Sequence, residues 1–385
     1  MRSRSSFLAV HRILAASVIL AAANVPLPPA SASAAACQSW GVQPPYIGTG
    51  RSELRGVAML SACDAWAVGW YTVGTSTKTL VEHWNGTTWR VITSPSPGST
   101  DSQLFGIAAS SPRDAWAVGE RRNGSSARTL IEHWNGHAWK VEPSPNEGSA
   151  STLNAVLAFS PIDAWTVGQR TIGASARTLI EHWNGHAWKV ARSPNVRSQF
   201  NTLAGIDGTS PTDIWVVGRH AKVENATPDR TLIERWNGND WKIVHSPNPS
   251  VQADSLLSVA ATTRRDVWTV GSIIRDGLTK TLVEHWNGRV WKVTASPNVP
   301  IANNYLAGIA MTSGKNGWAV GSFFDGATTR MLVEHWNGHT WKIVPTPNPA
   351  PSSSLAGIAA PSPDRAWAVG YYGTVQAQPL ALTCC

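Results

Sequence analysis

A tryptophan motif that recurs about every fifty residues restricts this chain more than any other feature. The motif is D-x-W-x-V-G or a near variant, and successive copies are spaced by 50, 49, 50, 53, 50 and 49 residues. Its tryptophans are Trp66, Trp116, Trp165, Trp215, Trp268, Trp318 and Trp367. A second motif, E-H/R-W-N-G-x-x-W, recurs six times and carries Trp84/Trp89, Trp134/Trp139, Trp183/Trp188, Trp236/Trp241, Trp286/Trp291 and Trp336/Trp341. Such a period indicates one structural unit repeated in space.

Each unit divides into four short strands, as its second copy illustrates. The apolar pattern predicts strands at Leu104–Ala108, Ala115–Gly119, Thr129–Trp134 and Trp139–Val141. An S-P-R-D turn separates the first two strands, and Asn135-Gly136 is a hairpin signal between the last two. No helical periodicity of useful length is present. Four strands in about fifty residues are typical of a β-propeller blade.

The ends of the repeat predict how the ring closes. Strand one occurs seven times, starting at Leu54, Leu104, Leu153, Leu203, Leu256, Leu306 and Leu355, but the W-N-G hairpin occurs only six times. The last unit ends without a fourth strand, and the segment W-G-V-Q-P-P at Trp40–Pro45 matches that missing strand. We therefore predict an all-β, seven-bladed β-propeller of four-stranded antiparallel blades, closed by a velcro blade shared between the N- and C-termini.

The first 36 residues read as a secretory signal peptide. Arg2, Arg4 and Arg12 precede or flank an uncharged apolar run from Ile13 to Val25, and small-residue cleavage sites follow. The run is short for a membrane span, so we expect a secreted protein with one propeller domain at residues 37–385 and no membrane span. A lipoprotein anchor on Cys37 is the alternative.

All four cysteines map to the region where the two ends of the chain should meet. Cys37, Cys384 and Cys385 fall in the shared blade, and Cys63 falls in the first turn of the adjoining blade. Export favours oxidation, so we predict that Cys37 and Cys63 pair with Cys384 and Cys385, with the choice of partner open. One disulfide with two free thiols is the alternative.

These motifs resemble those of known propellers. W-x-V-G followed by N-G-x-x-W is similar to the repeats of photosystem II assembly-factor propellers and of sialidase-like (BNR) propellers. D-A-W-A-V-G combined with E-H-W-N-G resembles Trp-rich repeat propellers of secreted actinobacterial proteins. The resemblance implies the fold and not an activity, because propellers carry many functions. The sialidase Asp-box is not kept, since Glu82 and Trp84 stand where it has Ser and Asp.

Charged residues favour structural roles over catalysis. The Glu-His pair recurs in five of the six hairpins, whereas a catalytic site needs one asymmetric pair, so we interpret it as a structural ladder in which Lys or Arg four residues earlier balances each Glu. We expect no metal, no cofactor and no catalytic constellation. The net charge of +8 is dispersed, which argues against nucleic-acid binding. We expect a monomer.

Variation among the repeats points to one face of the ring. The S-P-x-D and N-G-x-x turns change little, whereas the loops from strand two to three and from strand four to the next blade change freely. Both variable loops emerge on the same face, where recognition is usually placed. The candidate ligand-binding residues are Trp70, Tyr71, Arg121, Arg122, Arg170, Arg219, His220, Lys222, Arg275, Asp276, Phe323, Phe324, Asp325, Tyr371 and Tyr372. Alternatively, the sequences of these loops vary because no function restricts them.

Three function classes follow from these patterns. The first is a secreted, non-catalytic binding or scaffold propeller whose variable face meets a glycan or an extracellular or cell-envelope protein. The second is an extracellular carbohydrate-active hydrolase or lyase, for which the single-copy carboxylates are Glu120, Glu224, Asp229, Asp276 and Asp325. The third is a structural cell-envelope protein without a small ligand.

Overall fold

The structure, a computed structural model, describes residues 40–43, 50–197, 199–222, 228–374 and 376–384. Residues 1–34 and 35–385 form two units, and the described residues all belong to the second. The expected signal peptide, Cys37 and Cys385 therefore lie outside the described residues. Within the described ranges every regular element is a β-strand. None of these residues forms a helix with the length and hydropathy that crossing a bilayer requires.

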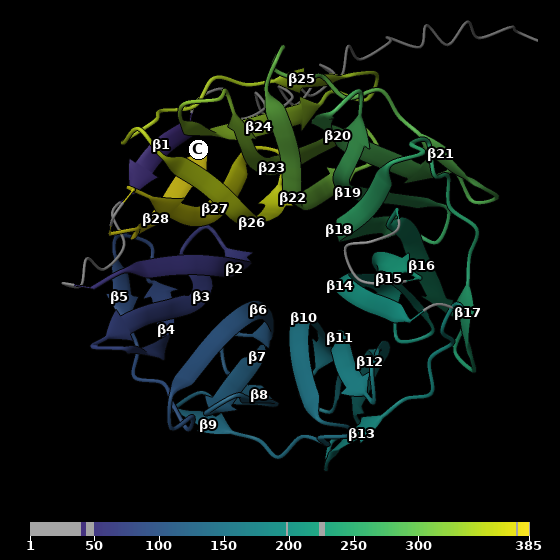
Figure 1. The fold of residues 1–385 in the computed structure, drawn as a ribbon. Helices are drawn as coiled ribbons and strands as arrows, with labels where there is room; N and C mark the ends of the chain where they lie inside the picture. Colours follow the sequence, from purple (N-terminus) through teal and green to yellow (C-terminus); the bar gives the residue numbers. More distant parts are fainter. Residues whose placement is uncertain (1–39, 44–49, 198, 223–227, 375, 385) are drawn as a thin grey trace, which may run out of the picture. The chain divides into compact units, whose positions relative to one another are not determined.

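The strands are organised into four-stranded antiparallel blades. Three blades are separate sheets, and two eight-stranded sheets each consist of two blades joined by one parallel bridge, Thr77 to Asp101 or Ala176 to Phe200. Within this unit the blades surround a central channel, with the first strand of each blade nearest the centre (Figure 1). The predicted all-β architecture of repeated four-stranded blades is thus confirmed.

The strands have the following bounds. Blade one comprises β2 (Ser52–Ser61), β3 (Asp64–Val73), β4 (Ser76–Trp84) and β5 (Trp89–Val91). Blade two comprises β6 (Asp101–Ser111), β7 (Asp114–Asn123), β8 (Ser126–Trp134) and β9 (Trp139–Val141). Blade three comprises β10 (Ala150–Ser160), β11 (Asp163–Ile172), β12 (Ser175–Trp183) and β13 (Trp188–Val190). Blade four comprises β14 (Phe200–Ser210), β15 (Asp213–Ala221), β16 (Arg230–Trp236) and β17 (Trp241–Ile243).

The remaining strands repeat this order. Blade five comprises β18 (Ala253–Thr263), β19 (Asp266–Arg275), β20 (Leu278–Trp286) and β21 (Trp291–Val293). Blade six comprises β22 (Asn303–Ser313), β23 (Asn316–Phe324), β24 (Thr329–Trp336) and β25 (Trp341–Ile343). The terminal blade comprises β26 (Ser353–Ser362), β27 (Arg365–Tyr372), β28 (Gln378–Cys384) and β1 (Trp40–Gln43). In it, β1 pairs antiparallel with β28, with Trp40 opposite Cys384.

The first three strands of each blade are longer than the sequence motifs predict. β7, for example, extends to Asn123, four residues past the motif glycine Gly119. Pairing continues because the second and third strands are joined by a tight turn, as between Asn123 and Ser126. Many residues predicted to lie in the loops between strands two and three therefore belong to strand ends, where side chains alternate between the two faces of a blade.

Tryptophan side chains fill the space between neighbouring blades. Trp66 of β3 is 2% exposed and contacts two rings of blade two, Trp134 and Trp139, with ring centroids 5.1 and 5.3 Å away. The same edge-on packing recurs between the later blades, and Trp367 of the terminal blade contacts Trp89 of blade one at 5.0 Å. Such pairs add about 1 kcal/mol each to the stabilisation from burial. The prediction that the repeated tryptophans form the core is confirmed for these rings.

The glutamate of the E-H-W motif is buried in every complete hairpin. In five blades the serine of the preceding blade's S/T-P segment donates a hydrogen bond to it, as Ser94 does to Glu132 at 2.6 Å. Burial raises the pKa of Glu132, Glu181, Glu234, Glu284 and Glu334 to about 8. The expected pairing with Lys or Arg four residues earlier is wrong, because four residues along a strand span about 13 Å. Arg230, for example, pairs with Asp254 instead.

The histidine that follows this glutamate is tied to the second strand. His133 Nε2 lies 2.7 Å from Asp114 Oδ1, and its ring stacks on Trp116 with centroids 4.0 Å apart. Blade four replaces the histidine by Arg235, which donates to Asp213 and covers Trp215. The repeated Glu-His pair therefore has the structural role that the sequence predicted.

The cysteines differ in part from the prediction. Cys63 is free and exposed, so its predicted disulfide is wrong for the structure described here. Cys384 is fully buried in the cluster with Trp40 and Trp318, on the side of β28 that faces blade six. Cys63 belongs to blade one, on the other side of the terminal blade, and packs on the hairpin glycine Gly86. This separation explains why these two cysteines do not pair.

The buried glutamates predict a stability that falls as the pH rises. The folded Glu132 keeps its proton up to about pH 8, whereas the unfolded chain releases it near pH 4.5. The folded state therefore binds the extra proton between these values, and the free energy of unfolding should fall by about 1.4 kcal/mol per pH unit per buried glutamate. Glu132→Gln should unfold like the parent near pH 4.5 and be more stable than it at pH 8, as measured by urea unfolding at several pH values. Glu142→Gln, a change at a partly exposed position, is the control, and an unchanged pH slope in Glu132→Gln would contradict the assignment.

Because blade four has Arg235 in place of the histidine, we predict that replacing its aspartate destabilises the protein more than the same change in another blade. Asp114→Asn should cost less than about 1 kcal/mol, because blade six already carries Asn316 hydrogen-bonded to His335 at 2.8 Å. Asp213→Asn should cost about 3 kcal/mol, because it leaves the guanidinium of Arg235 without its buried counter-charge. Urea unfolding at pH 7 measures both, and equal losses would show that the charge of Asp213 is unimportant.

Candidate functional site

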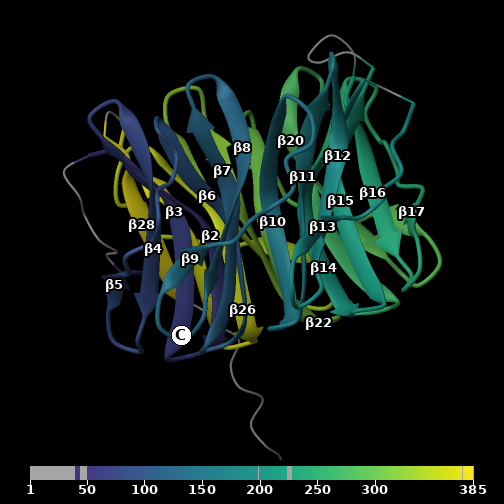
Figure 2. The ribbon, with the colours of Figure 1, turned by 90° about the horizontal axis from the view of Figure 1, so that it is seen from below.

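The two faces of the ring differ in how strictly they repeat. On one face, the repetitive face, each N-G hairpin is closed by its asparagine, as where Asn135 Oδ1 accepts hydrogen bonds from the backbone of His137 and Ala138. Gly136 has a φ of +88°, which a side chain would strain. The other face, the variable face, carries the turns from strand two to three and the connections between blades (Figure 2). The sequence predicted its candidate residues for this face.

The aromatic candidates are mostly covered. Trp70 is 8% exposed and lies beneath Arg51, whose guanidinium carbon is 5.4 Å from the ring centroid. Tyr71, Phe323 and Tyr372 pack partly into the clusters between blades, and Tyr371 is also half-buried. Phe324 keeps 39% of its surface exposed. Trp70 therefore cannot offer an open ring face for stacking, since strand alternation turns it toward blade two like Trp66.

The arginine candidates are held by carboxylates within or beside their own blade. Arg122 Nε donates to Glu120 Oε1 at 2.6 Å, and Thr152 of blade three donates to the other oxygen of Glu120 at 2.7 Å. Arg170 pairs with Glu147, and Arg219 pairs with Asp229. Arg121 is half-buried at the end of β7. The combination of arginine and carboxylate differs among these three blades, so the face presents a different arrangement at each of them.

A small pocket between blades three and four brings two of the candidates together. It encloses about 170 Å³ and is lined by Arg219, His220, Asp229 and Phe200, among others. Burial, with a smaller effect from Arg230, lowers the pKa of His220. Lys222 is exposed beside it.

The remaining candidates lie at exposed turns of blades five and six. Arg275 donates to the backbone oxygen of Pro249 at 3.3 Å. Asp276 adopts a φ of +53° in the turn after β19. Hydrogen bonds from the backbone of Thr328 and Ala327 lower the pKa of Asp325. None of these three residues contacts the arginine pairs of blades two to four in the interactions described.

Sequence reasoning missed an arginine pair at the start of the first blade. Arg51 and Arg55 both bind Glu53, with guanidinium nitrogen to carboxylate oxygen distances of 2.7 Å in each pair. The Glu53 side chain is 1% exposed, whereas those of Arg51 and Arg55 are 53% and 42% exposed. A signal was available, because Arg55 stands within the L-x-G motif at the one position that differs among most blades.

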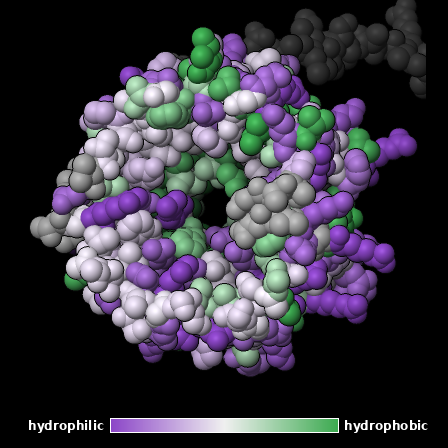
Figure 3. Space-filling model, in the orientation of Figure 1, coloured by the Kyte–Doolittle hydropathy of each residue, from purple (hydrophilic) through white to green (hydrophobic). Residues whose placement is uncertain are grey.

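Hydrophobic residues are also exposed on this face, which Figure 3 shows with the channel opening at its centre. Hydrophilic side chains gather over blades one and four, and hydrophobic ones over blades five and six (Figure 3). Val251 and Ile301, in the connections that precede β18 and β22, are 84% and 88% exposed. The face therefore combines cationic and apolar regions.

The central channel contains a cavity of about 210 Å³, lined by residues of the seven innermost strands. Several apolar side chains line it, with Val57, Ile107, Ile206 and Ile358 among them, although more of its exposed surface is polar than apolar. Ligands often bind at the mouth of a closed β-structure, where apolar side chains surround a few polar groups.

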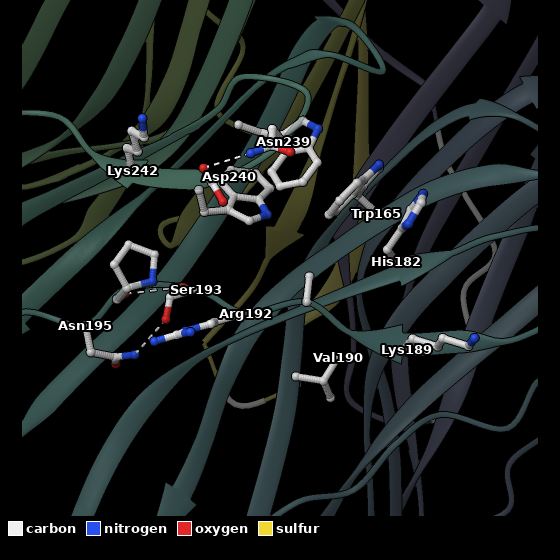
Figure 4. A pocket seen from close by; sticks show the side chains of 14 residues that line it. Trp165, His182, Lys189, Val190, Arg192, Ser193, Asn195, Asn239, Asp240 and Lys242 are labelled. Carbon is white, nitrogen blue, oxygen red and sulfur yellow. Dashed lines mark hydrogen bonds between the residues drawn. The ribbon is translucent and has the colours of Figure 1, made fainter.

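A groove of about 770 Å³ lies at the outer edge, between blades three and four. Lys189 and Val190 of β13 line one side, and Asp240 and Lys242 line the other (Figure 4). An equivalent groove of about 560 Å³ lies between blades one and two. Since repeat positions form both grooves, we interpret them as a consequence of the blade geometry.

The described residues offer little for catalysis in the positions expected. Glu120 and Asp229 are engaged by arginines, and Asp276 and Asp325 lie at separate turns. Glu224 lies outside the described residues. No group of three or more His, Cys, Asp or Glu side chains among the described residues could hold a metal ion.

Comparisons with known proteins identify the fold. The chain matches no protein-family model and no curated protein. A solved structure described as YCF48 bound to D1 peptide is 13% identical, with a TM-score of 0.57, and the match covers 90% of this chain and 97% of that one. An ulvan lyase from a new polysaccharide lyase family is 9% identical, with a TM-score of 0.57 and coverage of 90% and 94%.

A third similar structure is the β-propeller domain of the Trilobed protease from Pyrococcus furiosus, which is described as having an open velcro topology. It is 10% identical, with a TM-score of 0.52 and coverage of 87% of this chain and 95% of that one. At these identities the likeness shows the fold alone. The chain therefore has a β-propeller fold.

Proposed function

We propose that this protein is a non-catalytic binding propeller that recognises an anionic glycan or an acidic protein surface through its variable face. The observation that carries the proposal is the set of three arginine–carboxylate pairs, each of which is formed in one blade only among the described residues. A planar guanidinium that is already oriented loses less entropy when it binds a carboxylate or sulfate. On the repetitive face the same two turns recur from blade to blade, and the arginines around Asp213 of blade four are an exception.

The propeller itself, we infer, has seven blades closed by a velcro blade shared between the two ends of the chain. The pairing of β1 with β28 supports this. Two contacts between the terminal blade and blade one support it further: Ser52 N donates to Ala377 O at 2.8 Å, and Trp367 packs on Trp84. We also propose, from the sequence alone, that residues 1–36 direct export and that the protein acts outside the cell.

Similar folds support binding in a general way. One similar structure is described as bound to a peptide, and another is a polysaccharide lyase. The likeness to the lyase keeps a carbohydrate-active hydrolase or lyase as the alternative. Such an enzyme would need Glu120 or Asp229 released from its arginine when substrate binds. A structural cell-envelope role without a small ligand is the remaining alternative.

The test compares two sets of charge changes. Arg122→Gln, Arg219→Gln and Arg275→Gln together remove three exposed cations from the variable face. Lys140→Gln, Lys189→Gln and Lys292→Gln remove three exposed cations from the fourth strands and form the matched control. On an array of acidic polysaccharides and bacterial cell-wall polymers, the parent should bind, with weaker binding as salt increases. The arginine variant should lose at least tenfold in affinity, and the lysine variant less than threefold.

Thermal unfolding of both variants must show that they remain folded. Equal losses in the two variants would contradict recognition by the variable face. Release of shortened or unsaturated products from a bound polysaccharide would favour the lyase or hydrolase alternative. If the parent binds no polymer on the array, recognition of a glycan is excluded. A pull-down with acidic extracellular proteins, using the same variants, would then test recognition of a protein surface.

A further inference from the structure

The innermost strands share a local irregularity that directs one side chain per blade into the channel. In each of these strands the pairing register shifts directly after the leucine of the L-x-G motif, as between Leu54 and Gly56. A β-bulge of this kind re-aims the extra residue. The seven residues at the shift are Arg55, Phe105, Asn154, Ala204, Leu257, Ala307 and Ala356, and all of them line the channel.

This ring of seven residues is much less uniform than the positions around it. The preceding residue is leucine in every blade, and the following one is always small. The small residue lets neighbouring strands approach closely, since a Cβ on Gly106 would lie 2.9 Å from the Cα of Ala155. The bulged residue meets no such restriction, so its identity is free to serve a ligand.

Arg55 is the one charged residue among the described residues that line this cavity. Asn154 is polar, but its amide already donates to Leu203 O at 2.7 Å. The other members of the ring are apolar. The side chains that line the cavity therefore combine one cation with several apolar groups, which is the pattern of a site for a small amphipathic ligand.

The cation is both held in place and incompletely neutralised. Arg51 and Arg55 share the single carboxylate of Glu53, so the three side chains carry one excess positive charge. Glu53 precedes Arg55 on the same strand, nearer to the variable face, and it is buried. This contact places the Arg55 guanidinium toward the variable-face mouth of the channel, with N–H groups left over for a ligand.

We propose that the channel binds a monocarboxylate with a short apolar body. The carboxylate lies on Arg55 at the mouth, and the apolar body extends inward between Phe105 and Leu257. One excess positive charge matches one negative charge, and the planar guanidinium matches a carboxylate. The cavity of about 210 Å³ limits the body to a small group. The carboxylate is that of a free organic acid or of the last residue of a polypeptide.

This site goes beyond the proposed function, because it lies inside the channel and uses none of the arginines changed in the polymer-binding test. Either proposal can therefore fail without the other. The residues of the ring also allow a test by filling the cavity, since Ala204 and Ala307 are small and point into it.

The experiment measures binding of hexanoate and benzoate to the mature protein by ligand-observed NMR and calorimetry, with hexanamide and benzamide as uncharged counterparts. Both acids should bind at least tenfold more tightly than their amides. Arg55→Gln should weaken the acids at least tenfold and leave the amides unchanged, whereas Lys140→Gln, an exposed position outside both proposed sites, should leave both unchanged. Equal affinity for acid and amide, no binding of either acid at millimolar concentration, or full binding in Arg55→Gln would overturn the proposal.

Cavity-filling variants place the ligand. Ala307→Phe should abolish binding of the acids. If thermal denaturation shows that this variant is not folded, Ala204→Phe replaces it. Retained binding of the acids in a folded variant would overturn the location of the site in the channel. Short peptides ending in leucine distinguish the source of the carboxylate. Binding of the free-acid peptide but not of its C-terminal amide would identify a polypeptide end, and binding of the free acids alone would identify a small metabolite.

Discussion

The contact between the second-strand tryptophan of one blade and the hairpin tryptophans of the next is the interaction on which the rest of the structure depends. A blade of four short strands cannot bury both of its faces alone, so each Trp-to-Trp contact joins two blades and completes one core cluster. Trp318 packs edge-on against Trp40, 5.4 Å away, which gives β1 the same place that the fourth strand has elsewhere. The repeat of about fifty residues is thus the repeat of this contact.

Polar groups in the same interfaces add order to the apolar packing. The buried glutamate accepts a hydrogen bond from the preceding blade, which links neighbouring blades, and the His–Asp bond fixes a ring over the second-strand tryptophan. Burial raises the pKa of five of these glutamates to about 8, which keeps them largely protonated at neutral pH, so the interface avoids the cost of a buried charge. Arg235 in blade four shows that the position accepts a cation when it can reach Asp213.

The freedom to vary follows from this arrangement. Residues in the interfaces are restricted by both neighbouring blades, and the turns of the repetitive face are restricted by positive φ angles and by asparagine caps. Strand ends on the variable face and bulged positions in the channel have neighbours on fewer sides. Individual residues such as Arg55, Arg122 and Arg219 gather at these positions, and a binding site can form there without disturbing the packing.

Sequence alone determined the blade, because the period of the motifs, the N-G hairpins and the pattern of strands depend on local chemistry that repeats identically. It also identified the structural role of Glu132 and His133, since a residue present in most blades cannot form one asymmetric site. Tertiary structure decided which variable residues are accessible: Trp70, one residue past the motif glycine, is buried beneath Arg51, whereas Arg122, three residues past it, is exposed near the end of β7. It also decided that Glu132 bonds to a serine of another blade and that Arg55 lines the channel, because contacts between blades and the aim of a bulged residue arise only when the blades pack together.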